Sequence, residues 1–297
     1  ILDTLRSRLS LEEKKKINFV TLAQYNREAD FKDFAKKGKD KIAVIYAVGG
    51  IGGGEGDDDN IGSDRISEAI RKARKDSTVK AIVLRVNSPG GSALASDVIW
   101  REVALAQKAK PVVVSMGDVA ASGGYYIACA ADVIVAQPNT ITGSIGVFGL
   151  MPNMQKFFNN KLGITIDTVN SNTHSDFGSP FRPIGDAEGM IIQKSVEDIY
   201  TTFINRVAEG RKMTPAQVDS IGQGRVWSGI DAKEIGLVDE LGGLEDAIRI
   251  AAERAKLENY KLEELPKQKD AFEEFIKGIS GDVSERLMKA QLKENYE

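Results

Sequence analysis

The feature that most constrains the fold is a series of short, unbroken apolar runs that alternate with helix-like segments. The runs are KIAVIYAV (41–48), VKAIVLRV (79–86), PVVVSM (111–116) and VIVAQP (133–138). Continuous runs rich in β-branched residues are typical of strands buried on both faces of a parallel sheet. Repeated strand–helix–strand units therefore predict an α/β fold, with a mostly parallel sheet and flanking helices.

Helices are predicted between and after these strands. One is expected from Ser63 over SDRISEAIRKARKD, which has an N-cap signal and apolar residues at helical spacing. From about Asp186 the sequence becomes helical, and residues 188–211 read as one long amphipathic helix. Shorter helices are expected near 214–222, 231–236 and 243–257. By contrast, the glycine-rich stretch GGIGGGEGDDDNIG (49–62) is predicted to lack regular structure.

The ends of the chain differ in composition from its centre. Residues 1–40 are polar and lysine-rich, which favours a linker or a helical lead-in, and residues 41–258 are expected to form the folded domain. Residues 259–297 are charged with amphipathic pieces, and either a packed helical tail or a solvated terminus fits them. The chain begins without Met, as expected of a piece of a longer or processed protein.

Composition excludes several classes of function. The net charge of −3 gives no electrostatic reason to expect nucleic acid or an anionic membrane as a partner. Cys129 is the single cysteine and sits among apolar residues, so it is expected to be a buried packing residue rather than part of a disulfide or a metal cluster. No apolar run has the roughly 18 residues of a membrane span.

The glycine-rich stretch 49–62 also fails as a ligand motif. Its glycines lack the offsets of a dinucleotide-binding loop, and Asp57, Asp58 and Asp59 would repel a phosphate. The acidic trio lacks the spacing and the terminal glutamate of a calcium-binding EF-hand loop. No cofactor and no metal ion are therefore expected.

Two glycine-bearing turns follow neighbouring predicted strands. NSPGGS (87–92) lies where a strand ends and a helix begins, and AASGG (120–124) holds the equivalent place after the next strand. Ligands of open α/β sheets bind at such strand ends. Backbone N–H groups of these turns could stabilise an oxyanion. The small residues around Ser122 would let a substrate approach its hydroxyl, although a serine here can also be a simple helix cap.

A serine nucleophile needs a base, and the sequence leaves that base open. His174 is the only histidine and lies in a polar stretch, SNTHSDFGSP, where a surface role is the ordinary expectation. A lysine can replace histidine if burial lowers its pKa. Lys156 and Lys161 are candidates by position along the chain, but nothing in NMQKFFNNKLG indicates burial.

Several motifs together closely resemble the signal peptide peptidase A (SppA) family of bacterial serine endopeptidases. They are NSPGGS, the long run from GDVAASGGYY to GSIGVFG, GSPFR, and GRVWSGIDAKEIGLVDELGG, and the resemblance spans about residues 41 to 255. It implies a ClpP/crotonase-like fold and cleavage of signal-peptide remnants. It also implies that Ser122 is the nucleophile, with the Gly90–Gly91 turn and the Gly123 N–H forming the oxyanion hole.

One position departs from the family pattern. Short members carry the base lysine in a segment resembling YKDxGSPFR, whereas this chain has THSDFGSPFR, with Ser175 in the place of that lysine. Long members resemble a tandem duplication in which the N-terminal half supplies the lysine and the C-terminal half the serine. The chain is therefore expected to be the C-terminal half of a long form, nearly inactive alone.

The resemblance also implies partners and a location. The expected partners are a peptide substrate, the N-terminal half of the same protein and further copies of the chain, as a tetramer in the full-length form. The expected location is the periplasmic face of a bacterial inner membrane, with the anchor outside this chain. The alternatives are a Ser-His-Asp protease of the ClpP type, a crotonase-like acyl-CoA enzyme and a non-catalytic assembly domain of the same fold.

Overall fold

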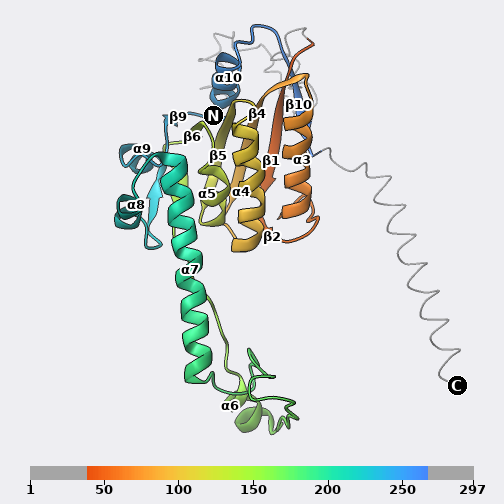
Figure 1. The fold of residues 1–297 in the computed structure, drawn as a ribbon, viewed down its shortest axis with the longest axis vertical. Coiled ribbons are helices and arrows are strands. Elements are labelled where there is room, and N and C mark those ends of the chain that lie inside the picture. Colours follow the sequence, from red (N-terminus) through yellow and green to blue (C-terminus); the bar gives the residue numbers. More distant parts are fainter. Residues whose placement is uncertain (1–38, 267–297) are drawn as a thin grey trace, which may run out of the picture.

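The computed structural model describes residues 39–266, and its centre is an eight-stranded sheet (Figure 1). Six strands follow the order β10-β1-β4-β5-β6-β9, all parallel, while β7 pairs with β5 and, antiparallel, with β8. The strands are β1 (Lys41–Val48), β4 (Val79–Ser88), β5 (Val112–Ala121), β6 (Val133–Ala136), β7 (Ile141–Gly143), β8 (Val226–Ser228), β9 (Glu240–Leu241) and β10 (Lys261–Leu265). The predicted mostly parallel sheet is confirmed.

Helices cover both faces of this sheet. They are α3 (Ser63–Lys75), α4 (Ala93–Gln107), α5 (Gly123–Ala128), α6 (Gln155–Phe157), the π-helix η2 (Phe158–Leu162), α7 (Asp186–Arg211), α8 (Pro215–Ile221), α9 (Gly229–Glu234) and α10 (Leu244–Arg254). Helices α3, α4 and α5 lie together on one face, and α10 packs on β4 and β5 from the other (Figure 1).

Strand β1 shows why the apolar runs are unbroken. Ile42 and Val44 belong to the core beneath α10, whereas Ala43 and Ile45 belong to the larger core beneath α3 and α4. All four side chains are buried. Because successive residues of a strand point to opposite faces, burial on both faces requires apolar residues at every position.

Three parts of the fold differ from the sequence-based expectation. The stretch 49–62 contains two short parallel strands, β2 (Gly50–Gly52) and β3 (Asn60–Gly62), each of which buries one isoleucine, Ile51 or Ile61. The third predicted strand continues to Ala121. Strand β10 pairs with β1 beyond residue 258, where the domain was expected to end, so the sheet includes residues assigned to the tail.

The expectations for most of the two ends lie outside the described residues. This applies to the lead-in over residues 1–38 and to the amphipathic pieces of the helical extension after residue 266. Of the helices that are described, α7 included, none has both the length and the apolar character needed to cross a bilayer.

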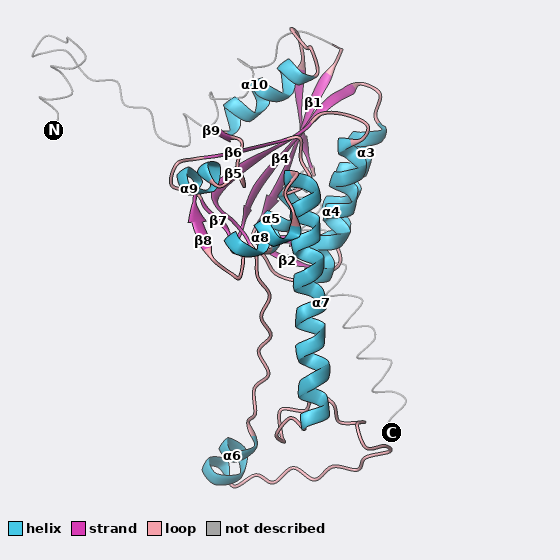
Figure 2. Cartoon of the chain, turned by 60° about the vertical axis from the view of Figure 1, so that its left-hand side comes forward, coloured by secondary structure: helices cyan, strands magenta, loops and turns pink. Residues whose placement is uncertain are grey.

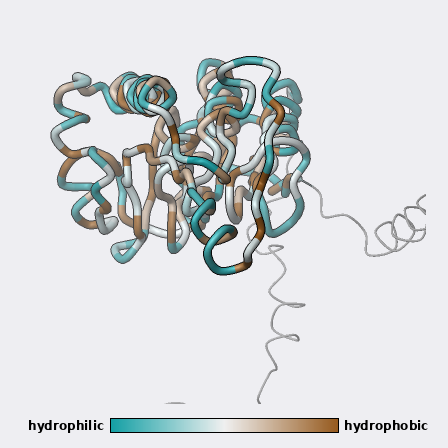
Figure 3. Tube along the Cα trace, turned by 90° about the horizontal axis from the view of Figure 1, so that it is seen from below, coloured by the Kyte–Doolittle hydropathy of each residue, from teal (hydrophilic) through white to brown (hydrophobic). Residues whose placement is uncertain are grey.

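A long arm projects from the body of the protein. We define it as residues 148–199, which comprise most of the segment between β7 and α7 and the first half of α7 (Figures 1 and 2). Several of its large apolar side chains are exposed, among them Phe148 (91%), Leu150 (85%) and Val169 (100%). Figure 3 views the molecule from the end of the arm, with the chain coloured by hydropathy. Hydrophobic segments, in brown, alternate with hydrophilic ones along the trace.

The second half of α7 anchors the arm to the body. Phe203 lies 4.7 Å from Tyr126 between ring centroids, and Val207 is fully buried. Gly210 lies so close to α5 that an added Cβ would come within 1.9 Å of the carbonyl oxygen of Cys129. Cys129 is fully buried as predicted, and burial raises the pKa of its thiol to about 12.

We predict that Gly210→Ala lowers the free energy of unfolding by about 1–3 kcal/mol, because the methyl group forces α7 away from Cys129. Gly189→Ala in the same helix is the matched control, since a Cβ there meets no atom within 4 Å. The control should leave stability unchanged or raise it by up to about 1 kcal/mol. Urea unfolding measures both, and equal effects would contradict the close packing of α7 on α5.

Candidate active site

Ser122 stands at the junction of β5 and α5 in a strained backbone conformation. Its φ of 52° and ψ of −119° match the first central position of a type II′ turn, which glycine normally occupies. The turn is fixed on both sides, because the Ser122 N–H donates to Gly143 O at 2.9 Å and Ser122 O accepts from the Tyr126 N–H at 2.9 Å. Strain of this kind costs on the order of 1–3 kcal/mol and clusters at functional sites.

The Ser122 hydroxyl is not used as a helix cap. The residue is the N-cap of α5, yet its side chain makes no capping hydrogen bond. Within residues 39–266, no hydrogen bond to Ser122 Oγ is present, and the residue is half-buried rather than enclosed. The hydroxyl therefore has no hydrogen-bond partner among the described residues, and the simple capping role considered above is wrong.

The two glycine turns meet at Ser122. A Cβ added to Gly90 would lie 2.6 Å from Gly123 N and 2.9 Å from Ser122 Cβ. One added to Gly123 would lie 3.2 Å from Gly91 N. Gly90 also has a φ of +101°, which side chains rarely adopt. Glycine is needed at these positions because the backbones of the two turns are in contact.

The Gly91 N–H is directed away from Ile51 of β2. Ile51 of β2 pairs with the turn through the flanking groups, since Ile51 N donates to Gly90 O at 2.9 Å and Ser92 N donates to Ile51 O at 2.8 Å. In a parallel bridge of this kind the central residue's own N–H faces the opposite side. In the described part of the chain, neither Gly91 N–H nor Gly123 N–H donates a backbone hydrogen bond.

Two serines that the sequence analysis did not single out support these turns. Ser88 and Ser96 are both fully buried. Ser88 Oγ accepts from the Gly90 N–H at 3.1 Å, and Ser96 Oγ donates to Ser92 O at 2.9 Å. A Cβ on Gly123 would come within 2.6 Å of Ser96 Oγ. Their only signal in the sequence is the excess of serine in NSPGGSALAS.

The structure separates the candidate bases from Ser122. Lys156 and Lys161 belong to α6 and η2, which lie at the far end of the arm (Figure 2). His174 Nδ1 is 3.7 Å from Glu188 Oε1 in the first turn of α7, at the same end. Ser175, next in sequence, donates its hydroxyl to Asn172 O. None of these residues is brought to the serine of the same chain.

An arginine holds the tip of the arm together. Arg182 donates to both carboxylate oxygens of Glu188, at 2.8 and 2.6 Å, and to both of Asp176, at 2.7 and 2.9 Å. These hydrogen bonds lower the pKa of each carboxyl group to about 2. The Gly185 N–H adds a bond to Glu188 at 3.0 Å. Arg182, the last residue of the GSPFR motif, therefore stabilises the tip of the arm through these hydrogen bonds.

Comparison with known proteins identifies the family. The model of peptidase family S49 matches residues 104–258, more than half of the chain. The chain belongs to peptidase family S49. Protease 4 of Salmonella typhi is 46% identical over 250 residues, covering 84% of this chain and 40% of that protein. The chloroplastic serine protease SPPA of Arabidopsis thaliana is 36% identical over 304 residues, covering 99% of this chain and 45% of that protein.

The expected relationship to SppA proteases is thus confirmed. A relative from Methanocaldococcus jannaschii that is named as a protease is 37% identical over 240 residues. The match covers 76% of this chain and 75% of that protein. In contrast, the chain spans less than half the length of the Salmonella and Arabidopsis proteins.

The Clp protease family model, together with the mostly parallel sheet and its flanking helices, confirms the expected fold class. The Clp protease model matches residues 53–142, the region that contains both glycine turns. Among solved structures, a ClpP1 mutant from Listeria monocytogenes has a TM-score of 0.46 at 19% identity, covering 69% of this chain and 94% of that chain.

The strain at Ser122 leads to a prediction about stability. Ser122→Gly should have a free energy of unfolding at least about 1 kcal/mol higher than Ser122→Ala, because only glycine relaxes at this φ and ψ. Ser67, in the middle of α3, provides the control, where alanine should be the more stable replacement. Urea unfolding of the four variants measures this. If the same replacement, glycine or alanine, were the more stable one at both positions, the result would contradict a strained backbone at Ser122.

The tip of the arm should respond to acid. Since the folded-state pKa values of Asp176 and Glu188 are lowered, their stabilising effect is complete above about pH 5 and is lost as the pH falls toward about 2. Backbone NMR resonances of residues 174–188 should therefore move toward disordered values over this range. In Glu188→Gln the change should be smaller. Unchanged tip resonances down to pH 2 in the wild type would contradict the assignment.

Proposed function

We propose that the chain provides the nucleophile and the oxyanion hole of a serine endopeptidase of the SppA type. The observation that carries this proposal is the contact between the two glycine turns, with the half-buried Ser122 hydroxyl beside two backbone N–H groups that have no acceptor in residues 39–266. Membership of peptidase family S49 supports a peptide as the substrate.

In this proposal Ser122 Oγ attacks the carbonyl carbon of the scissile peptide bond. Its proton passes to a neutral base, and the N–H groups of Gly91 and Gly123 stabilise the negative charge that develops on the carbonyl oxygen. The protonated base then gives its proton to the leaving amine, and water hydrolyses the ester left on Ser122. Removing one such N–H donor typically costs about 3–4 kcal/mol of transition-state stabilisation.

We propose that the base is a lysine from the N-terminal half of the longer protein. Three observations support this: Ser175 stands where short family members have a lysine, the arm carries that segment away from Ser122, and the chain spans about 40% of Protease 4. A lysine in this role must be neutral, so its pKa must be lowered by burial in the completed site.

The arm supports an assembly with further domains of the same kind. Its exposed apolar side chains are unusual for a surface in contact with water and are typical of an interface between proteins. An arm that projects from one domain can reach the active site of the next. We propose a homo-oligomer, a tetramer in the full-length form, that cleaves signal-peptide remnants at the periplasmic face of a bacterial inner membrane.

A peptidase assay tests this function. The chain alone should cleave an apolar fluorogenic peptide at least several orders of magnitude more slowly than the chain co-assembled with the upstream half, since the base is then present. A fluorophosphonate probe should label Ser122 in the assembly, and Ser122→Ala should abolish both labelling and cleavage.

Ser92→Ala is the matched control, because Ser92 lies in the neighbouring turn and caps α4. It should retain labelling at Ser122. Full activity of the chain alone, with loss in Ser122→Ala, would contradict a base supplied by the other half. Cleavage by the assembly that survives Ser122→Ala would overturn the proposed function.

A further inference from the structure

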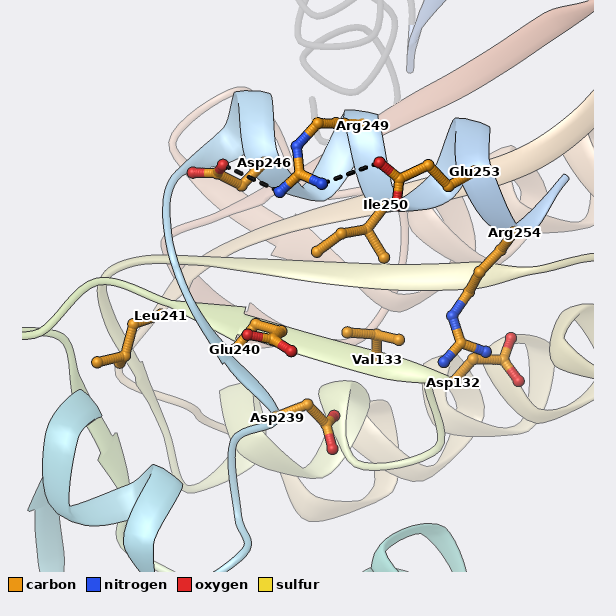
Figure 4. Close-up of a pocket in the computed structure, with 10 residues that line it drawn as sticks. All are labelled: Asp132, Val133, Asp239, Glu240, Leu241, Asp246, Arg249, Ile250, Glu253 and Arg254. Carbon is orange, nitrogen blue, oxygen red and sulfur yellow. Dashed lines mark hydrogen bonds and ion pairs between the residues drawn. The ribbon is translucent and has the colours of Figure 1, made fainter. Parts of the chain in front are cut away.

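The motif GRVWSGIDAKEIGLVDELGG (224–243) takes no part in the chemistry proposed above. Its last part contains β9, the edge strand of the sheet, and lines a cavity beside α10 (Figure 4). There the carboxylates of Asp239 and Glu240 already have partners, Arg211 at 2.6 Å and Lys233 at 3.4 Å. This end of the motif therefore stabilises the edge of the sheet.

The beginning of the motif lies next to the candidate active site. It contains β8, which pairs antiparallel with β7 and places Trp227 opposite Thr142. Strand β7 in turn pairs with β5 and places Gly143 opposite Ala121, the residue before Ser122. Strand β8 is therefore joined to the nucleophile through a single intervening strand.

One peptide unit, Gly143–Ser144, connects β8 to the nucleophile directly. Its carbonyl oxygen accepts from the Ser122 N–H at 2.9 Å, and its N–H donates to Arg225 O at 2.8 Å. A trans peptide unit is planar, with its C=O and N–H pointing in opposite directions. The unit is therefore held between the main chain of the GRVWSG segment on one side and the backbone of Ser122 on the other.

The local backbone does not by itself favour this orientation of the peptide unit. Both of its residues are left-handed, with a φ of 73° at Gly143 and of 47° at Ser144. A residue other than glycine keeps such a conformation only where surrounding contacts fix it. Glycine has several other conformations open to it, so the peptide unit can turn unless a neighbouring group prevents it.

The Trp227 ring supplies this neighbouring group. A Cβ added to Gly143 would lie 2.7 Å from Trp227 Cδ1, so the ring fills the space that a side chain at Gly143 would need. The orientation of the ring is fixed, because its Nε1–H donates to Ile221 O at 3.0 Å and its apolar part packs against the larger core. Removing the ring would leave an empty space beside Gly143.

We propose that Trp227 is a positioning residue for the Ser122 nucleophile. It holds the Gly143–Ser144 peptide unit in the orientation in which its carbonyl accepts the Ser122 N–H, and this bond keeps Ser122 at its unfavourable φ beside the N–H groups of the oxyanion hole. The inference rests on the proposed function, because it assigns Trp227 to the same reaction. A displacement of about 1 Å at a reacting group can lower a rate about a hundredfold.

Amide hydrogen exchange of the 297-residue chain, followed by NMR, tests this role without any need for activity. In Trp227→Leu the protection factor of the Ser122 N–H should fall at least about tenfold relative to that of the Val114 N–H in the core of β5. A general loss of stability would lower both alike. Trp100→Leu is the matched control: Trp100 is the only other tryptophan and packs in α4 against the Arg206 guanidinium at 3.6 Å. It should leave the ratio unchanged.

Turnover by the chain co-assembled with its upstream half is the second measurement. Trp227→Leu should lower kcat about ten- to a hundredfold and leave KM within about threefold of the wild-type value, since the nucleophile is displaced and the bound peptide is not. Trp100→Leu should keep the wild-type kcat. If Trp227→Leu does not fold, Trp227→Met, which has an adaptable apolar side chain but no ring, takes its place with the same expectations.

Equal effects of the substitutions at Trp227 and Trp100, on the exchange ratio or on kcat, would overturn the inference. A wild-type assembly that neither cleaves peptide nor reacts with the probe at Ser122 would overturn the proposed function instead. In that case the exchange ratio, which is measured on the chain alone, still decides whether Trp227 holds the Ser122 backbone.

Discussion

The candidate site depends on the contact between two backbone turns at the carboxyl ends of adjacent parallel strands. Strand β4 ends at Ser88 before the Gly90–Gly91 turn, β5 ends at Ala121 before Ser122, and the pairing of Ser88 with Ala120 brings these ends together. Only glycine allows this approach, since a Cβ at Gly90 would collide with the next turn. The buried parallel sheet is therefore what places the Ser122 hydroxyl beside the N–H groups of Gly91 and Gly123, which have no acceptor among residues 39–266.

The body of the protein and its arm differ in how far they bury their apolar side chains. The body buries apolar residues on both faces of its sheet and fixes the serine. The arm buries little, keeps large apolar side chains on its surface and is held at its tip by Arg182. This division fits the proposal that the chain supplies one part of a site, since the chain spans less than half the length of the Salmonella and Arabidopsis relatives.

Local patterns predicted the body better than the arm. The runs 41–48 and 79–86 and the helix 63–75 follow from periodicity, because burial dictates their composition. The strands β2 and β10 could not be predicted: β2 depends on a single buried Ile51, and β10 is charged because it lies at the sheet edge. Glycines and small residues indicated both turns around Ser122, but the strained φ of that serine depends on tertiary contacts that no local pattern encodes.

In the proposed mechanism, the N–H groups of Gly91 and Gly123 face the atom that accepts negative charge when Ser122 reacts. The crystal structure of a peptide boronate adduct, formed on the chain assembled with its upstream half, tests this most directly. We expect a bond from boron to Ser122 Oγ and one boronate oxygen within about 2.7–3.1 Å of both nitrogens. An adduct on Ser122 whose oxygens contact neither N–H would rule out this oxyanion hole.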